Sequence, residues 1–430
     1  MFEDLNGKKL LIIGGVKMAC DLVKRAQKMG VYVLVADYLE DSPAKKVADK
    51  GVLVDALDID ALVNLCIKEK IHGITTGYVD ILLPICYEVA KRLGLPYYAT
   101  EEMIDVSTNK VSFKNMCRKY DVPVPITYNV NSKSYIEEAD RLDYPVFVKP
   151  LDASGSRGAS VCKTKEEFVL NFEIALSYSK QKKVVVEEYL KGTDFIMDYL
   201  VIDGEPYLMS MFDRKMCSNR PSAVNHANLL ISPSYKLESY INEIHSKVCK
   251  MFKMMGFRNG LIFLQGYIDK DKVTFFEMGC RLGGTFPNIV EKFTGINPMD
   301  ILIHYSLTGS MISKNVKNTI NPYFDGKGAV INFIINEPKG KIDKIIGLED
   351  IMKMPEVVNC IQFMEEGDEF ELGNLTDKPV IILYIVADSF SNLKEVINKI
   401  YSKFKVLDSN NKSLLMPFFK TEYLDDKLYL

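Results

Sequence analysis

The segment YPVFVKPLDASGSRGAS, from Tyr144 to Ser160, joins a short apolar run to a loop of small residues. A single lysine, Lys149, lies at the junction, ahead of Gly155 and Gly158. A Walker A loop carries its lysine after the glycines, so this segment is not a Walker A motif. Either the segment is an ordinary strand and turn, or its lysine projects from the strand while the loop closes over a phosphate as a flap.

The residues before this segment alternate between strand-like and helix-like patterns from Lys9 to Ala99. Such alternation predicts βαβ units and a parallel, doubly wound sheet. Gly14 and Gly15 follow the first strand and Asp37 ends the second, but the G-x-G-x-x-G spacing of a dinucleotide site is not met. We therefore expect a tight turn beside a small substrate site.

The remainder of the chain divides at two further points. Ser107 to Pro125 reads as a helix that a proline pair ends, which predicts a linker into a second unit. Beyond Gly326 the pattern indicates a smaller unit of mixed strands and helices. The predicted domains are 1–108, 109–325 and 326–430.

Composition limits the classes of function. The chain has 430 residues, of which 47% are apolar, a net charge of -3 and a pI near 6.0. Because it has no dense basic run, we expect no nucleic-acid partner and no membrane partner. Nine scattered cysteines without a C-x-x-C pair argue against a zinc site and a disulfide framework, and favour a cytoplasmic protein with reduced thiols. No apolar run reaches the roughly 18 residues of a membrane helix.

Four features that could carry chemistry follow one another along the chain. Lys110 opens the linker helix, Lys149 ends a strand, and VVVEEYLKGTDF, from Val184 to Phe195, places acids at a strand end. The fourth is GLIFLQGYIDKDKVTFFEMGCRLGGT, which puts Gln265 and Glu277 on the arms of a hairpin and Arg281 beyond it. Taken singly, these are solvated lysines, surface acids and an edge hairpin.

Together, and in this order, the four features resemble the ATP-grasp superfamily, which includes biotin carboxylase, carbamoyl phosphate synthetase and amino-acid ligases. The resemblance implies an α/β and α+β multidomain protein. Its Rossmann-like, parallel-sheet N-terminal domain precedes an ATP-grasp domain, and a small mixed domain ends the chain. Within the ATP-grasp domain the implied small lobe with its flap spans about 121–187, and the large lobe about 188–325.

The resemblance also implies an ATP site. Lys110 and Lys149 match lysines that contact phosphates, and the flap would bring backbone N–H groups close to them. The hinge from Glu187 to Leu190 would hold adenine largely through backbone groups, and Asp194 stands where an acid, more often Glu, binds ribose. The implied ATP-binding residues are Lys110, Lys149, Ser154, Gly155, Ser156, Gly158, Glu187, Glu188, Tyr189, Leu190 and Asp194.

The hairpin implies a metal site. Mg²⁺, or Mn²⁺ in its place, takes hard oxygen ligands, which Gln265 and Glu277 supply if they share a face. That pairing requires an odd loop, such as Asp269 to Val273. Gly279 stands where the family usually has an asparagine, so one ligand is missing or supplied elsewhere.

Arg281 resembles the arginine that steadies an acyl phosphate or a substrate carboxylate, and a planar guanidinium suits that task. We therefore expect an ADP-forming ligase that acts on a small-molecule carboxylate, such as an amino acid, and an amine. A homodimer is compatible with this interpretation. One alternative is a carboxylase or carbamoyl-phosphate-type enzyme that uses bicarbonate. Another is a nucleotide-binding regulatory protein with a degraded site, as Gly279 would indicate.

Overall fold

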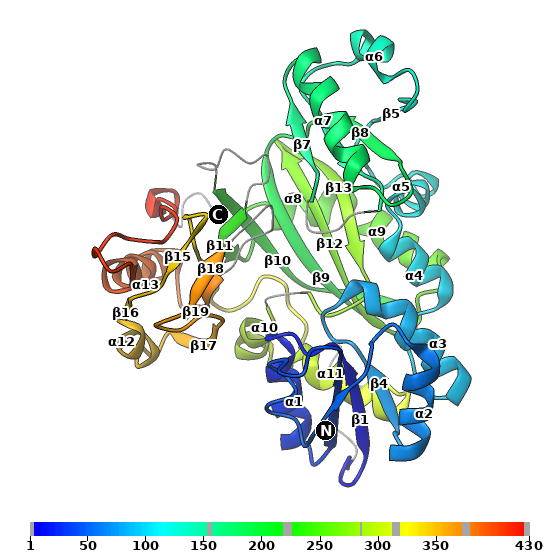
Figure 1. Cartoon of the computed structure of the whole chain (residues 1–430), viewed down its shortest axis with the longest axis vertical. Helices are drawn as coiled ribbons and strands as arrows, with labels where there is room; N and C mark the ends of the chain where they lie inside the picture. Colours follow the sequence, from blue (N-terminus) through cyan, green and yellow to red (C-terminus); the bar gives the residue numbers. More distant parts are fainter. Residues whose placement is uncertain are drawn as a thin grey trace.

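The computed structural model describes residues 4–152, 157–217, 226–283, 286–311, 319–371 and 379–424. In Figure 1 an N-terminal unit lies at the bottom, a small lobe at the top, and a large sheet extends from the centre toward the C-terminal segments on the left. No helix in these ranges is both long and apolar enough to cross a membrane.

The N-terminal unit contains a parallel sheet with the strand order β3-β2-β1-β4. Helices cover both faces, so Leu10 and Ile12 of β1 enter one core cluster while Leu11 and Ile13 enter another. The predicted doubly wound fold is thereby confirmed. Its elements are β1 (Lys9–Ile13), α1 (Ala19–Lys28), β2 (Tyr32–Asp37), β3 (Lys50–Leu53), α2 (Ile59–Glu69), β4 (Gly73–Thr75), η1 (Asp80–Leu82) and α3 (Leu83–Leu93).

The turn after β1 explains the residues that resemble part of a dinucleotide motif. The Asp37 carboxylate accepts hydrogen bonds from the backbone N–H of Gly15, at 2.6 Å, and of Leu39, at 2.8 Å. Gly14 has a φ of +91°, which suits glycine. Asp37 is buried. Both of its carboxylate oxygens therefore bind the chain's own backbone and fix the tight turn.

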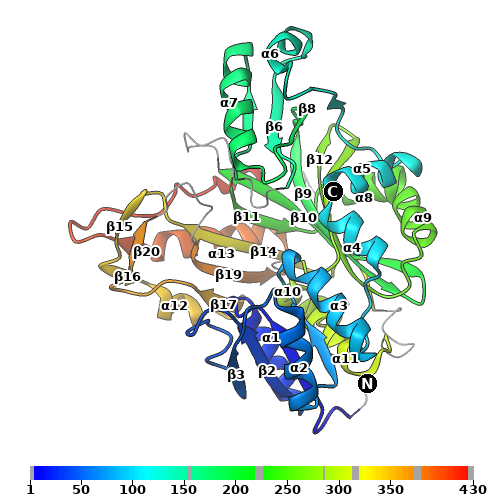
Figure 2. The ribbon, with the colours of Figure 1, turned by 45° about the vertical axis from the view of Figure 1, so that its right-hand side comes forward.

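The small lobe is an antiparallel sheet with the order β5-β8-β6-β7, and α7 covers one face. Figure 2 shows α3, α4 and α5 rising one after another from the N-terminal unit toward this lobe. The elements are α4 (Glu101–Thr108), α5 (Lys110–Lys119), β5 (Thr127–Tyr128), α6 (Tyr135–Glu138), η2 (Ala139–Arg141), β6 (Val146–Pro150), β7 (Ser160–Cys162), α7 (Lys165–Tyr178) and β8 (Val184–Glu188).

The large sheet has eight strands among the described residues, in the order β13-β12-β9-β10-β11-β14-β19-β17, and all neighbours are antiparallel. Its strands are β9 (Thr193–Ile202), β10 (Glu205–Cys217), β11 (His226–Ser232), β12 (Gly260–Asp269), β13 (Lys272–Gly279), β14 (Lys327–Ile334), β17 (Val357–Gln362) and β19 (Pro379–Ala387). Since β14 pairs with β11, hydrogen bonds cross the predicted boundary at residue 326, and the division into three domains stays a prediction.

Helices and short strands flank this sheet. α11 packs against α1 and β4 of the N-terminal unit, while α13 packs on β19. These elements are α8 (Leu237–Tyr240), η3 (Ile241–His245), α9 (Ser246–Met254), α10 (Pro287–Thr294), α11 (Pro298–Thr308), β15 (Lys339–Lys341), β16 (Lys344–Ile346), α12 (Leu348–Met352), β18 (Glu369–Glu371), α13 (Phe390–Lys403), β20 (Lys405–Leu407) and η5 (Thr421–Tyr423).

Candidate active site

Lys149 and Glu187 form a buried ion pair on adjacent strands of the small lobe. Phe147 of β6 lies opposite Glu187 of β8, so Lys149, two residues along, projects from the same face. Its Nζ lies 3.0 Å from Glu187 Oε2. Lys149 is 8% exposed and Glu187 2%. The predicted phosphate lysine is thus held in position by the side chain of a predicted hinge residue.

Lys114, which the sequence did not single out, completes this cluster. It projects from α5, is 3% exposed, and its Nζ contacts the other oxygen of Glu187, Oε1. Lys114 follows Lys110 by four residues, so both lie on one face of α5. This spacing was the available signal, but nothing in the sequence showed that the face is buried against β8.

The electrostatics of the cluster depend on its burial. Burial and then the charge of Lys149 lower the pKa of Lys114, whereas the Glu187 carboxylate in contact with it favours the ammonium form. Burial, followed by the charge of Lys110, lowers the pKa of Lys149 to about 7, and Glu277 opposes this shift. Lys110 and Glu277 therefore lie close enough to act on Lys149, as a shared phosphate site requires.

The hinge backbone is bonded within the small lobe. The Glu188 N–H donates to Ile126 O at 3.0 Å, and its side chain accepts from Ile126 N–H at 2.9 Å. The Tyr189 N–H donates to Pro145 O at 3.3 Å. Tyr189 is exposed and Leu190 half-buried. Adenine binding by this segment stays a prediction.

The flap falls mostly outside the described residues, which include neither Ser154, Gly155 nor Ser156. Gly158 is described and has a φ of +71°. A Cβ at this position would lie 2.9 Å from the Tyr178 side chain, so packing and backbone conformation both favour glycine here.

Asp194 lies on β9 and is buried between one residue of β10 and one of β12, the two strands beside β9. Arg214 of β10 and Tyr267 of β12 both pair with it in register. Arg214 Nη1 lies 3.0 Å from Asp194 Oδ1, and Tyr267 forms a side-chain hydrogen bond with it. Burial raises the pKa of Asp194. Its carboxylate thus has partners within the chain, and a ribose contact stays a prediction.

Gln265 and Glu277 lie directly opposite each other on β12 and β13, so they share a face. The expected odd loop is wrong. Asp269 pairs with Lys272, which leaves a two-residue turn, and a β-bulge at Phe276 supplies the extra residue that restores the register. Gln265 is half-buried and Glu277 exposed. The hairpin therefore offers an amide oxygen and a carboxylate side by side.

This pair fits a Mg²⁺ ion that takes its other ligands from phosphate and water. No group of three or more His, Cys, Asp or Glu side chains arranged for a metal occurs in the described part of the chain. Gln265 and Glu277 could hold such an ion only together with phosphate oxygens of the nucleotide.

Gly279 is explained by Phe263, its partner across the hairpin. A Cβ at Gly279 would lie 2.0 Å from the Phe263 ring, so an asparagine could not be accommodated there. The guanidinium of Arg281 lies over the same ring, 4.6 Å from its centroid. An aromatic support for Arg281 thus occupies the space that a third metal ligand would need.

Arg281 holds a carboxylate of the N-terminal unit. It donates from Nε to Asp80 Oδ1 and from Nη2 to Asp80 Oδ2, each at 2.7 Å, and from Nη1 to Leu282 O at 2.8 Å. The side chains of Arg281 and Asp80 are 17% and 42% exposed. The guanidinium therefore performs bidentate carboxylate binding where the N-terminal unit meets the large sheet.

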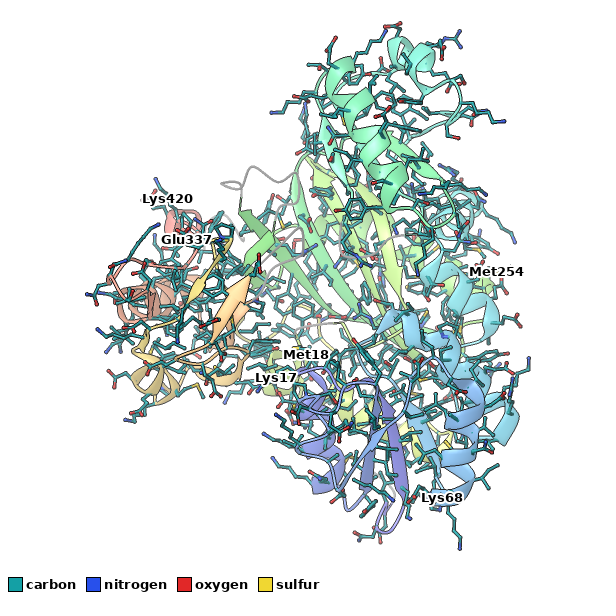
Figure 3. The ribbon with its side chains drawn as sticks, in the orientation of Figure 1. Lys17, Met18, Lys68, Met254, Glu337 and Lys420 are labelled. Atoms are coloured by element: carbon teal, nitrogen blue, oxygen red, sulfur yellow. The ribbon has the colours of Figure 1, made fainter. Side chains whose placement is uncertain are left out.

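The N-terminal unit contributes further groups to this junction. Figure 3 shows Lys17 and Met18, which follow the turn after β1, where that unit meets the rest of the chain. Met18 packs against the core cluster that contains Phe263. The turn beside which we expect a small-molecule site therefore faces the same junction, and the site itself stays a prediction.

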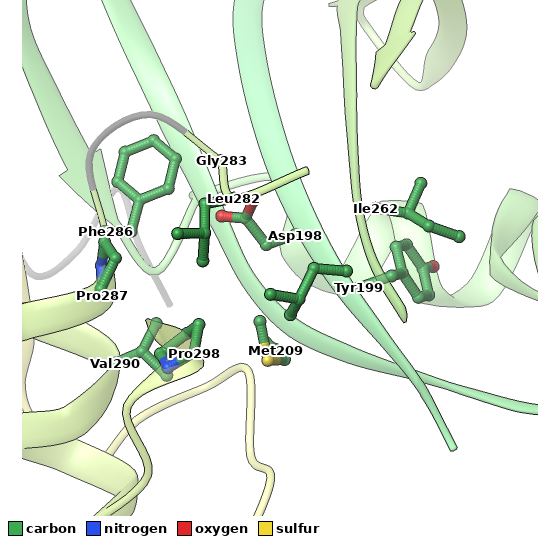
Figure 4. A pocket seen from close by; sticks show the side chains of 11 residues that line it. Asp198, Tyr199, Met209, Ile262, Leu282, Gly283, Phe286, Pro287, Val290 and Pro298 are labelled. Carbon is green, nitrogen blue, oxygen red and sulfur yellow. The ribbon is translucent and has the colours of Figure 1, made fainter. Parts of the chain in front are cut away.

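Asp198 is a second residue that the sequence did not reveal. It lies on β9 opposite Phe263 of β12, and the Ser210 hydroxyl donates to its Oδ2 at 3.2 Å. Burial raises its pKa to about 7. Figure 4 shows its carboxylate beside Gly283, where a Cβ would lie 1.8 Å from Asp198 Oδ1. The adjoining cavity of about 10 Å³ has room for no more than about one water.

Comparisons with known proteins identify relatives of this chain. Residues 109–307 match the family model described as carbamoyl-phosphate synthase L chain, ATP binding domain. The chain is 23% identical, over 79% of its length, to a formate-dependent phosphoribosylglycinamide formyltransferase of Prochlorococcus marinus, of which 91% is covered. It is 26% identical, over 76% of its length, to a carbamoyl phosphate synthase large chain of Clostridium acetobutylicum, of which 30% is covered.

Two solved structures share the fold. An L-amino acid ligase from Bacillus licheniformis gives a TM-score of 0.77 at 20% identity, over 94% of this chain and 100% of that one. The biotin carboxylase domain dimer of 2-oxoglutarate carboxylase from Hydrogenobacter thermophilus, in complex with MgADP and bicarbonate, gives 0.73 at 17% identity, over 93% and 90%.

Proposed function

We propose that this chain, which belongs to the ATP-grasp superfamily, is an ADP-forming ligase that joins a carboxylate to an amine through an acyl phosphate. The family establishes an ATP-dependent enzyme. The ligase reaction, its amino-acid substrate class and the residue roles below are our proposal.

The bidentate grip of Arg281 on Asp80 carries the proposal. Arg281 lies four residues beyond Glu277, and its guanidinium, packed over the Phe263 ring, binds both oxygens of the Asp80 carboxylate. The same guanidinium can therefore bind the carboxylate of a substrate. A substrate carboxylate that replaced Asp80 would lie beside the hairpin expected to hold the metal and the phosphates. In-line phosphoryl transfer needs such positioning together with neutralisation of charge, and no protein nucleophile.

The chain's residues would divide the work between two lobes. Lys149 and Lys110 would neutralise phosphate charge from the small lobe, while Gln265 and Glu277 would hold Mg²⁺ from the large sheet. When bound, Mg²⁺ supplies positive charge to the phosphate oxygens. The carboxylate oxygen attacks the γ-phosphorus and ADP leaves; the amine then attacks the acyl carbon, phosphate leaves, and a proton is released. Closure of the flap around Gly158 would exclude water from the acyl phosphate.

The first test is ADP formation with amino acids, singly and in pairs, and with bicarbonate. We expect release of ADP that depends on both a carboxylate and an amine. Lys149→Ala should lose about 100- to 1000-fold in turnover, the range for one preorganised charged group, while Lys163→Ala, at an exposed lysine of the same lobe, should not. Release that depends on bicarbonate would support the carboxylase alternative, and nucleotide binding without turnover would support a regulatory protein.

The second test concerns Arg281. If it binds the acyl group rather than the nucleotide, Arg281→Ala should keep nucleotide affinity and lose ligation. Direct nucleotide binding and ADP formation at saturating ATP measure the two properties separately. A large fall in ATP affinity with normal ligation would contradict this role.

A further inference from the structure

A basic cavity of about 380 Å³ lies in the small lobe, between α5 and the edge of the sheet at β5 and the start of β8. None of the described residues that line it is acidic. Its cationic residues are Lys110, Lys114, Arg118, Lys182 and Lys183. This volume is within the range of small-molecule sites, and the lining predicts a ligand with negative charge.

The charges on α5 are unfavourable for the helix alone. Lys110, Lys114 and Arg118 recur at intervals of four residues on one face, and like charges at this spacing destabilise a helix. Lys110 also stands in the first turn, where the helix dipole disfavours a cation. A sequence that opposes its own local structure in this way indicates a functional site.

Among the residues that the structure describes, three of the lining cations have no carboxylate partner. Arg118 donates to the neutral side chains of Asn115, at 3.4 Å, and Thr127, at 3.3 Å. The ion pairs of the described residues include none formed by Arg118, Lys182 or Lys183. A guanidinium and a neighbouring ammonium group suit the oxygens of a phosphate group.

This cavity shares Lys110 with the predicted nucleotide site but none of that site's other described residues. Its lining includes neither Lys149, Glu187, the hinge from Glu188 to Leu190, nor the hairpin residues Gln265 and Glu277. Lys114 connects the two sites, because it lines the cavity and contacts Glu187, which in turn contacts Lys149.

We propose that this cavity binds a phosphate-bearing small molecule, and that its occupancy weakens nucleotide binding at Lys149. An anion beside Lys114 would draw its ammonium group away from Glu187. Glu187 would then pair more fully with Lys149, which would have less charge to offer the nucleotide. The effect on nucleotide binding rests on the proposed function of Lys149, whereas binding of the phosphate-bearing molecule in the cavity does not.

Calorimetric titration with inorganic triphosphate tests the site directly. We expect two binding events for the wild type, of which Lys149→Ala keeps the event in the cavity. Arg118→Gln with Lys183→Gln should weaken that event at least about 10-fold, as the loss of two charged hydrogen-bonding groups implies. The matched control is Lys119→Gln with Lys180→Gln, which removes two cations that do not line the cavity. A single event that depends wholly on Lys149, or equal binding by the double variant and its control, would overturn the site.

The dissociation rate of a pre-bound fluorescent ATP analogue tests the link. Simple competition cannot accelerate dissociation, so only a ligand at a second site can do so. We expect triphosphate to raise this rate about 5-fold in the wild type and the control, the lower end of coupling between sites, and to leave it unchanged in the Arg118/Lys183 variant and in Lys114→Met. An unchanged rate in the wild type would overturn the link through Lys114.

Discussion

Two cations predicted to bind ligand each hold a carboxylate of the chain itself, but in different surroundings. Lys149 and Glu187 form their pair inside the small lobe, where both side chains are at most one-tenth exposed. Arg281 and Asp80 form theirs between the large sheet and the N-terminal unit, where the Asp80 side chain is 42% exposed. A buried pair cannot lose one partner without stranding a charge, whereas an accessible pair can exchange its carboxylate for another. We infer that Glu187 positions Lys149, and that Asp80 occupies the position on Arg281 that a substrate carboxylate would take.

Glu187→Gln should break the buried pair with the largest effect. It leaves two buried lysines without their carboxylate, so we expect a loss of about 3–5 kcal/mol in the free energy of unfolding, measured by urea denaturation. Glu137→Gln, at an exposed acid of the same lobe, serves as the control and should change it by less than about 0.5 kcal/mol. Equal stability of the two variants would show that the pair is not structural.

Glu277→Gln tests the role of the Glu277 carboxylate, whose charge raises the pKa of Lys149. It keeps the shape and removes the charge expected to bind Mg²⁺, so turnover should fall at least about 100-fold while nucleotide binding weakens less. ADP formation across a Mg²⁺ titration measures this. Asp269→Asn, an exposed acid on the opposite arm of the hairpin, should leave the titration unchanged. Unaltered rate and Mg²⁺ dependence in Glu277→Gln would place the metal elsewhere.

The pH dependence of nucleotide affinity sharpens the comparison further. Phosphate binds the ammonium form of Lys149, whose pKa burial lowers to about 7 in the free protein. Affinity should therefore be highest below pH 7 and should weaken by up to about tenfold per pH unit as the pH rises above it. Titrations of an ATP analogue between pH 6 and 9 measure this, with Lys149→Met expected to show a flatter profile. Affinity that rises with pH would contradict the assignment.

Asp80→Asn should have the smallest effect and the opposite sign. The neutral amide competes less well for Arg281, so the KM for a substrate carboxylate should fall about 5-fold, in keeping with the modest energy of a partly exposed ion pair. Steady-state kinetics with the carboxylate varied measure this, and Asp60→Asn, an exposed acid of the same unit, is the control. A raised KM would show that Asp80 itself helps to bind substrate.

The sequence was informative where a local pattern of apolar and polar residues determines the type of an element and which of its side chains share a face. Strand–helix alternation from Lys9 onward predicted the parallel sheet, and the sequence also predicted a hairpin with Gln265 and Glu277 on its two arms. Whether these two side chains share a face depended on the length of the loop, which the sequence did not fix. The bulge at Phe276 was not predicted. The number of residues between Gln265 and Glu277 shows that one extra residue is needed for them to pair, but not whether that residue lies in the turn or in a strand.

Contacts between distant segments could not be predicted. Lys114 acquires its role only when α5 packs beside β8, and Asp80 only when the N-terminal unit meets the residues after β13. Gly279 appeared in the sequence as a missing ligand, whereas the structure shows a position that the Phe263 ring has filled. Each of these depends on packing between elements, which side-chain periodicity within one element does not specify.

The pairing of β11 with β14 has a consequence for any attempt to divide this protein. Cleavage at residue 325 would remove β14, β17 and β19, and β11 would become an unprotected sheet edge with free N–H and C=O groups. Leu229 and Ile231, now buried against the C-terminal elements, would become exposed beside that edge. Such a fragment would present a template for intermolecular strand addition, so its aggregation would report on the cut rather than on the folding of the remaining lobes.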